Sequence, residues 1–183
     1  MLKSMRQSSL THSLFLLLLL LGACHASNEN PRKQLSKDEV DQHIASVNKE
    51  LALADKELIE RYFQKREWEY TSTGSGLLYY IYKKGVGTKV AKEATVQISY
   101  SISLLDGTVC YGADSPVVKE FVVGMGKEIS GLEEGVLLLR EGDRAIIAIP
   151  PHLAHGLLGD EAKIPPRSTI IYNVSVEKVL QNK

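Results

Sequence analysis

Two closely spaced histidines and one internal cysteine are the first candidates in this sequence for binding a metal ion or attacking a substrate. His152 and His155 are separated by two residues, a spacing that on a helix could hold a metal ion. They follow Pro150 and Pro151, however, and no cysteine or acidic residue stands at a recognised spacing to provide a third ligand. Cys110 has no partner cysteine in the body of the chain, which disfavours a redox role. The sequence therefore predicts no metal site and no covalent catalysis.

The composition describes a folded domain of ordinary size with an appendage. Of the 183 residues, 44% are hydrophobic and 24% are charged, and the formal net charge is zero. This balance excludes a disordered chain. It also excludes nucleic acid as a partner, because binding phosphates requires a basic excess. Two cysteines are too few for a disulfide framework.

The N-terminal segment 1–23 is predicted to be a secretory signal peptide. Basic residues open it, and its apolar run 14–21 is eight residues long, too short for a transmembrane helix of about 20 residues. The sequence Leu21-Gly22-Ala23-Cys24 resembles a bacterial lipobox, in which the cysteine is lipidated and becomes the first mature residue. The alternative is an ordinary signal peptide followed by a cysteine placed there by chance.

The lipobox implies a protein that is anchored in the cell envelope through acyl chains on Cys24. Removing the signal peptide removes Lys3 and Arg6 and no acidic residue, so the remaining body is slightly negative and is not attracted to an anionic bilayer. Stable attachment then needs more than one acyl chain. Residues 24–35 are polar and are interpreted as a tether. His25, where the enterobacterial sorting rule would have aspartate for the inner membrane, favours the outer membrane, with the body facing the periplasm or the surface.

A long helix is predicted over residues 36–67. Ser36 and Glu39 form a capping box, in which each side chain pairs with the backbone amide of the other. Apolar residues then recur with a period near 3.5: Val40, Ile44, Val47, Leu51, Ala54 and Leu58. So narrow a stripe suits a seam between paired helices, and therefore a homodimer through residues 37–66. The alternative, which the residues leave equally open, is that the stripe packs on the rest of its own chain.

Residues 68–183 are predicted to form an α+β domain, an antiparallel sheet with one short helix. Alternating apolar and polar side chains predict half-buried strands at 96–104 and 170–177, and Asp106-Gly107 indicates a hairpin turn after the first of them. The remaining elements are expected as short strands at 77–82, 121–123 and 144–149, a helix at 129–138, and a proline-rich loop at 150–167.

Five short motifs in order resemble the FKBP-type peptidyl-prolyl cis-trans isomerases. They are Val96-Gln97-Ile98-Ser99-Tyr100, Leu105-Asp106-Gly107-Thr108, Gly131-Leu132-Glu133-Glu134-Gly135-Val136, Glu141-Gly142-Asp143-Arg144-Ala145 and Lys163-Ile164-Pro165-Pro166. None is specific alone, but five in order over residues 95–180 are strong evidence for the fold. The resemblance implies a curved antiparallel sheet wrapped on a short helix. The preceding long helix is similar in place to the extensions of envelope members that dimerise.

The resemblance implies rotation about X–Pro bonds of unfolded or folding exported polypeptides. Resonance keeps the amide planar behind a barrier of about 18–20 kcal/mol. The twisted amide is less polar than the planar one, so an apolar cavity removes part of the preference of water for the planar form. A thousandfold acceleration needs only about 4 kcal/mol of differential stabilisation. We therefore expect an apolar pocket with a few hydrogen bonds and no cofactor.

Five pocket residues are carried over by this resemblance. Tyr100 stands at a pocket tyrosine, and Ile129 stands at the isoleucine whose backbone amide binds a substrate carbonyl. Leu132 replaces the tryptophan that forms the pocket floor in many members. Ile164 and Tyr172 occupy apolar wall positions, with Tyr172 in place of the usual phenylalanine.

Four further positions depart from the family pattern. His155 replaces the tyrosine whose hydroxyl donates to the substrate, a role that an imidazole could still fill. Cys110 and Tyr111 stand where the family has phenylalanine and aspartate, and Lys119 stands at another pocket aromatic. These changes imply weaker catalysis and weaker macrolide binding. They keep open a second hypothesis, a non-catalytic chaperone or docking module with the same fold, and a third, a membrane-tethered spacer whose functional part is the helix seam.

Overall fold

The computed structural model describes residues 36–180, and from Asp41 onward the chain forms one compact unit. In chain order the elements are α2 (Lys37–Gln64), β1 (Thr71–Ser72), β2 (Leu78–Lys83), β3 (Thr95–Leu104), β4 (Val109–Tyr111), β5 (Val117–Val122), α3 (Ser130–Leu137), β6 (Arg144–Ile149), the 3-10 turn η1 (Pro151–Leu153) and β7 (Ile170–Leu180). The predicted signal peptide, tether and lipidation site at Cys24 lie outside the described residues. None of the helices in the described part is long and apolar enough to cross a membrane.

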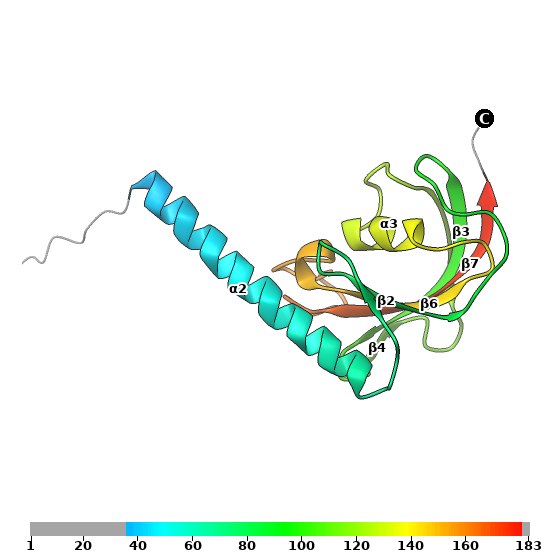
Figure 1. The fold of residues 1–183 in the computed structure, drawn as a ribbon, viewed down its shortest axis with the longest axis horizontal. Helices are drawn as coiled ribbons and strands as arrows, with labels where there is room; N and C mark the ends of the chain where they lie inside the picture. Colours follow the sequence, from blue (N-terminus) through cyan, green and yellow to red (C-terminus); the bar gives the residue numbers. More distant parts are fainter. Residues whose placement is uncertain (1–35, 181–183) are drawn as a thin grey trace, which may run out of the picture. The chain divides into compact units, whose positions relative to one another are not determined.

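The seven strands form one antiparallel sheet that curves around α3, as Figure 1 shows. The strand order is β1-β2-β6-β7-β3-β4, with β5 also paired to β3. The two long strands β3 and β7 lie side by side at its centre and pair over their whole length, from Thr95 opposite Leu180 to Leu104 opposite Ile170. The structure confirms the predicted α+β class, with a curved sheet on a short helix preceded by a long one.

The alternation predicted for the two long strands is confirmed, with one exception on β7. Along β3, buried and partly exposed side chains alternate from Thr95 to Ser103. On β7, Tyr172, Val174 and Val176 are buried as expected, but Ile171 on the opposite face is also buried, at 3% exposure. The sequence assigned that face to solvent, and the physical reason for the difference is that α2 covers it there.

Helix α2 begins at the predicted capping box and ends against the outer face of the sheet. The Ser36 amide donates to Glu39 Oε2 at 2.8 Å, and the Glu39 amide donates to Ser36 Oγ at 3.2 Å. Near the other end, Ile59 and Phe63 are fully buried in a second cluster with the sheet residues Leu78, Ile146, Ala148 and Ile171. These two helix residues lie outside the predicted apolar stripe, so the helix packs on its own chain through a different set of side chains.

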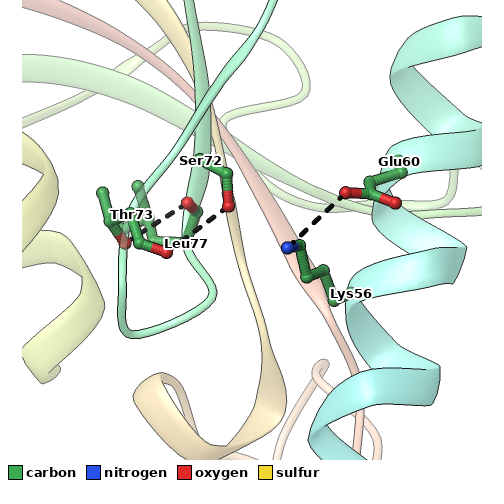
Figure 2. Close-up of polar contacts among 5 residues, drawn as sticks. All are labelled: Lys56, Glu60, Ser72, Thr73 and Leu77. Atoms are coloured by element: carbon green, nitrogen blue, oxygen red, sulfur yellow. Dashed lines mark hydrogen bonds and ion pairs between the residues drawn. The ribbon is translucent and has the colours of Figure 1, made fainter.

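The turn between β1 and β2 is held by its own polar groups, as Figure 2 shows. The Thr73 amide donates to the Leu77 carbonyl at 2.9 Å, and the Thr73 hydroxyl donates to the same oxygen at 3.4 Å. The Ser72 hydroxyl donates to the Thr73 carbonyl at 3.4 Å. Figure 2 also shows the Lys56–Glu60 ion pair on α2. It is 3.8 Å long and its side chains are 42% and 31% exposed, so solvent screens it and it adds little stability.

A partly buried ion pair joins α2 to the proline-rich loop. Arg167 Nη2 lies 2.9 Å from Asp55 Oδ1, and Asp55 is only 7% exposed. Arg167 also has a positive φ of 54°, a strained backbone conformation for a residue with a side chain. Its amide donates to the Gly156 carbonyl at 2.9 Å. These contacts fix the path of the loop that carries His155 and Ile164.

Candidate active site

Two tyrosines from the central strands form the aromatic part of the candidate site. Tyr172 on β7 lies opposite Ile102 on β3, which places it diagonally from Tyr100, two residues away on β3. The ring centroids are 5.1 Å apart with an interplanar angle of 39°. Both side chains are buried in the main core cluster, at 8% and 5% exposure. The pairing of β3 with β7 therefore brings together two of the predicted pocket residues.

Both tyrosine hydroxyls keep contact with solvent. Neither one hydrogen-bonds to another described residue, and no side-chain nitrogen or oxygen in residues 36–180 is both sealed from solvent and unpaired. Burial raises the pKa of Tyr172 well above its ordinary value, and the neighbouring Tyr100, Glu128 and Tyr111 raise it further. The Tyr172 hydroxyl therefore stays protonated at neutral pH and can donate a hydrogen bond to a ligand.

Ile129, the residue before helix α3, packs against the core cluster that contains both rings. Ile129 is the residue before the helix, with φ −58° and ψ 141°, and its carbonyl accepts the amides of Leu132 and Glu133 at 3.0 and 3.2 Å. Within residues 36–180 the amide of Ile129 itself donates to no acceptor. Ile129 packs against the core cluster that also contains the fully buried Leu132. Ile129 thus carries a backbone donor that no described residue accepts, next to the apolar core cluster.

The proline-rich loop adds Ile164, which is 3% exposed, to the same cluster. Cys110 on β4 is also buried there, and its Sγ donates to the Lys163 carbonyl at 3.5 Å. Burial raises the pKa of the Cys110 thiol, and the charges of Asp160 and Asp106 raise it further. The thiol is therefore neutral at physiological pH. Cys110 is thus a buried member of the core cluster.

Tyr111 hydrogen-bonds to a carboxylate that the sequence analysis did not single out. Its hydroxyl donates to Asp160 Oδ2. Burial alone would raise the pKa of Asp160, but the hydrogen bonds from Tyr111 and from the amides of Ile164, Ala162 and Lys163 lower it well below the ordinary range. Asp160 is therefore ionised at neutral pH. The same hydrogen bond raises the pKa of Tyr111, so the tyrosine remains the donor.

Lys119 is neutralised at the margin of the site. Its Nζ lies 2.8 Å from Glu128 Oε2, next to Ile129 in the chain. Lys119 shares the core-facing side of β5 with Val117 and Phe121. Its side chain is 39% exposed, and that of Glu128 is 15% exposed. Lys119, which stands where the family has a pocket aromatic residue, is thus paired with Glu128. This carboxylate was not predicted as part of the site.

Comparison with known proteins identifies the family. A family model described as FKBP-type peptidyl-prolyl cis-trans isomerase matches residues 87–177. FK506-binding protein 2 of Yarrowia lipolytica is 35% identical over 108 residues, which cover 57% of this chain and 73% of that protein. The chain belongs to the FKBP-type peptidyl-prolyl cis-trans isomerase family. The resemblance inferred from the five sequence motifs is confirmed.

Two bacterial proteins are similar to more of this FKBP-type chain. A probable FKBP-type peptidyl-prolyl cis-trans isomerase FkpA of Neisseria meningitidis is 31% identical over 157 residues, which cover 84% of this chain and 57% of that protein. The crystal structure of FkpA from Escherichia coli superposes with a TM-score of 0.56 at 25% identity, covering 80% of this chain and 74% of the other. The chain thus spans little more than half the length of its Neisseria relative.

The two histidines of the proline-rich loop of this FKBP-type chain have different surroundings. His152 Nε2 lies 2.9 Å from the Ser75 carbonyl oxygen, a contact with the turn before β2. His155 is partly buried, and no hydrogen bond within residues 36–180 joins it to Tyr100, Tyr172 or the other site residues. In the same described range, no three His, Cys, Asp or Glu side chains gather as ligands for a metal ion.

Two acidic residues at the candidate site of this FKBP-type domain were not predicted from the sequence. Asp160 pairs with Tyr111, and Glu128 pairs with Lys119. A signal for Asp160 was present, because Gly159-Asp160 four residues before Ile164 is typical of a turn in which an aspartate accepts nearby backbone amides. No comparable local signal marks Glu128, because its partner is nine residues away on another element.

Proposed function

We propose that this chain catalyses cis-trans isomerisation of X–Pro bonds in proline-containing polypeptides. The observation that carries the proposal is the unpaired Ile129 amide at the edge of a cluster walled by Tyr100, Tyr172 and Ile164. A polypeptide whose carbonyl accepts this amide would place the adjoining proline against apolar side chains. Membership of the FKBP-type family supports the same activity.

The geometry fits a reaction that needs no bond to be made or broken. The barrier of about 18–20 kcal/mol comes from amide resonance, which is lost when the bond twists. Apolar walls replace water, which stabilises the more polar planar amide better than the twisted one. The Ile129 amide holds the chain on one side of the rotating bond, and the protonated Tyr172 hydroxyl is a second donor at the same surface.

Replacing Ile129 with proline tests this donor directly. The φ of −58° already suits proline, and the lost N–H makes no hydrogen bond within the described residues, so the fold should persist. We expect kcat/KM for a proline-containing peptide to fall by about tenfold, the effect of losing one net hydrogen bond of about 1.4 kcal/mol. The measurement is a peptide isomerisation assay on protein lacking residues 1–23, with circular dichroism as the check on folding.

Ser130→Pro is the matched control, because it removes the neighbouring amide at the first helical position, where proline is well tolerated. This variant should keep the kcat/KM of the parent. Equal losses in both variants would argue against the Ile129 amide as the donor. A folded parent protein with no activity above the uncatalysed rate would instead favour the alternative function, a non-catalytic chaperone or docking module of the same fold.

We propose further that the protein acts on exported polypeptides in the cell envelope. The support is the sequence Leu21-Gly22-Ala23-Cys24, which follows a short apolar run with a basic start. Residues 1–23 would be the signal peptide, Cys24 the lipidated anchor and residues 24–35 the tether that separates the catalytic domain from the outer membrane. Incorporation of labelled palmitate that is lost in Cys24→Ser tests the anchor.

We propose that two copies pair through the helix at residues 37–66. The stripe residues Ile44, Val47 and Leu58 are 52%, 39% and 46% exposed, while the packing of α2 on its own sheet uses other side chains. Sedimentation should show a dimer that Ile44→Glu converts to a monomer. Leu53→Glu, at a residue that is 58% exposed but off the stripe, should leave the dimer intact. A parent protein that sediments as a monomer would contradict the proposed pairing of two helices.

A further inference from the structure

Hydrogen bonds between Asp160 and Ile164 close the loop that carries Ile164. The Asp160 amide donates to the Ile164 carbonyl at 3.1 Å, and the Ile164 amide donates back to Asp160 Oδ1 at 2.7 Å. The same oxygen accepts the amides of Ala162 and Lys163 at 3.0 and 2.9 Å. The backbone amide and the backbone carbonyl of Ile164 are therefore both hydrogen-bonded to Asp160. The position of Asp160 thus fixes the position of Ile164.

The other carboxylate oxygen of Asp160 joins this loop to the sheet. Asp160 Oδ2 accepts the Tyr111 hydroxyl, and Tyr111 is the last residue of β4, paired with Ile102 on β3. No regular turn or strand pairing links the loop to β4. The hydrogen bond is charge-assisted because Asp160 is ionised, which makes it stronger than a bond between neutral groups.

A β-bulge directs two consecutive side chains of β4 at this loop. Ile102 pairs with Tyr111 and Ser103 pairs with Val109, so Cys110 is the extra residue between two pairs. In a regular strand Cys110 and Tyr111 would point to opposite faces. Here the Cys110 thiol reaches the Lys163 carbonyl at 3.5 Å while the Tyr111 hydroxyl reaches Asp160. Lys163 Nζ also lies 5.2 Å from the centroid of the Tyr111 ring.

We propose that Tyr111 and Asp160 are positioning residues, whose hydrogen bond latches the loop 159–164 onto β4 and so holds Ile164 in the wall of the site. The proposal deepens the isomerase function proposed above and rests on it. Neither side chain has to touch the rotating bond. The latch keeps the wall closed before a peptide arrives, so binding does not have to order the loop.

This role predicts a specific kinetic signature for Tyr111→Phe. The variant keeps the aromatic ring and loses only the hydroxyl. If the loop then occupies its closed arrangement about one tenth of the time, the apparent KM rises about tenfold, while kcat of the bound complex stays close to the parent value. Irreversible loss of folded protein would act differently, because it would lower the apparent kcat and leave KM unchanged. Reversible unfolding of the whole domain would also raise KM, but it would speed amide exchange throughout the sheet and not in this loop alone.

The experiment combines this kinetic split with amide hydrogen exchange. In Tyr111→Phe, the amides of Ala162, Lys163 and Ile164 should exchange faster, because the carboxylate that accepts them is no longer anchored. Tyr82→Phe is the matched control. It removes a tyrosine hydroxyl that donates to Asn173 Oδ1 at 2.8 Å elsewhere on the sheet, and it should change neither KM nor this exchange.

The outcomes separate the latch from the activity. Raised KM together with faster exchange at the three amides in Tyr111→Phe alone supports the proposal. Unchanged KM with unchanged exchange overturns it, and so does a fall in kcat at constant KM. If the parent protein shows no isomerase activity, the proposed function fails. The exchange data then still show whether the hydrogen bond holds the loop.

Discussion

Gly131→Ala is expected to destabilise the domain by about 2 kcal/mol, because α3 has no room for a side chain where it crosses β6. A Cβ at this position would lie 2.2 Å from Ile149 Cγ2 and 3.0 Å from the Leu153 carbonyl oxygen. Ile149 is fully buried and cannot move aside. Overpacking of this kind costs about 1–3 kcal/mol or more, and the better helix propensity of alanine offsets only part of it.

Urea denaturation measures this loss, and Gly74→Ala provides the control. Nothing lies within 4 Å of a Cβ built on Gly74, so that variant should stay within about 0.5 kcal/mol of the parent. Isomerase activity of Gly131→Ala should also fall, because a displaced α3 moves the Ile129 amide relative to the core cluster. A Gly131→Ala protein as stable as the parent would show that α3 does not approach β6 this closely.

Gly159→Ala is expected to lower kcat/KM by at least about tenfold, because it opens the loop that carries Ile164. Gly159 has a φ of +75°, which costs a residue with a side chain about 1–2 kcal/mol. In addition, its Cβ would lie 2.2 Å from the Ile164 carbonyl oxygen and 2.8 Å from the Pro165 carbonyl carbon. The loop cannot close on Ile164 with that atom in place.

Gly156→Ala separates the two penalties at Gly159. Gly156 lies in the same loop with a φ of +60°, but nothing lies within 4 Å of its Cβ position. It should therefore show the backbone penalty in urea denaturation and only a small change in kcat/KM. If both variants lost activity equally, the cause would be backbone strain in general and not the closure of the loop on Ile164.

The secondary structure and the family could be predicted from the sequence, because their signals are local. The capping box at Ser36, the alternation along β3 and the Asp106-Gly107 turn each depend on a few neighbouring residues, and the structure confirms all three. What could not be predicted was the packing of α2. Ile59 and Phe63 contact strands far away in the chain, and nothing local distinguishes these two from the residues of the exposed stripe.

At the candidate site, the apolar residues could be predicted from the sequence, but the polar contacts around them could not. Tyr100, Tyr172, Leu132 and Ile164 could be named because the family motifs and the strand pattern place apolar side chains there, and all four are buried in one cluster. Their polar surroundings could not be named, because a hydrogen bond such as that between Tyr111 and Asp160 joins residues 49 positions apart.

By itself, the sequence determined the order of the elements, which follows from the periodicity of nearby residues, and the family, which follows from its short motifs. The candidate site residues are what that family resemblance implies. The tertiary structure alone decided which charges are neutralised and which loop is held to which strand. Lys119 meets Glu128, and Arg167 meets Asp55, only when the sheet has curved around α3 and α2 has packed on its outer face. Charge pairing acts over a few ångströms in space and leaves no period in the chain.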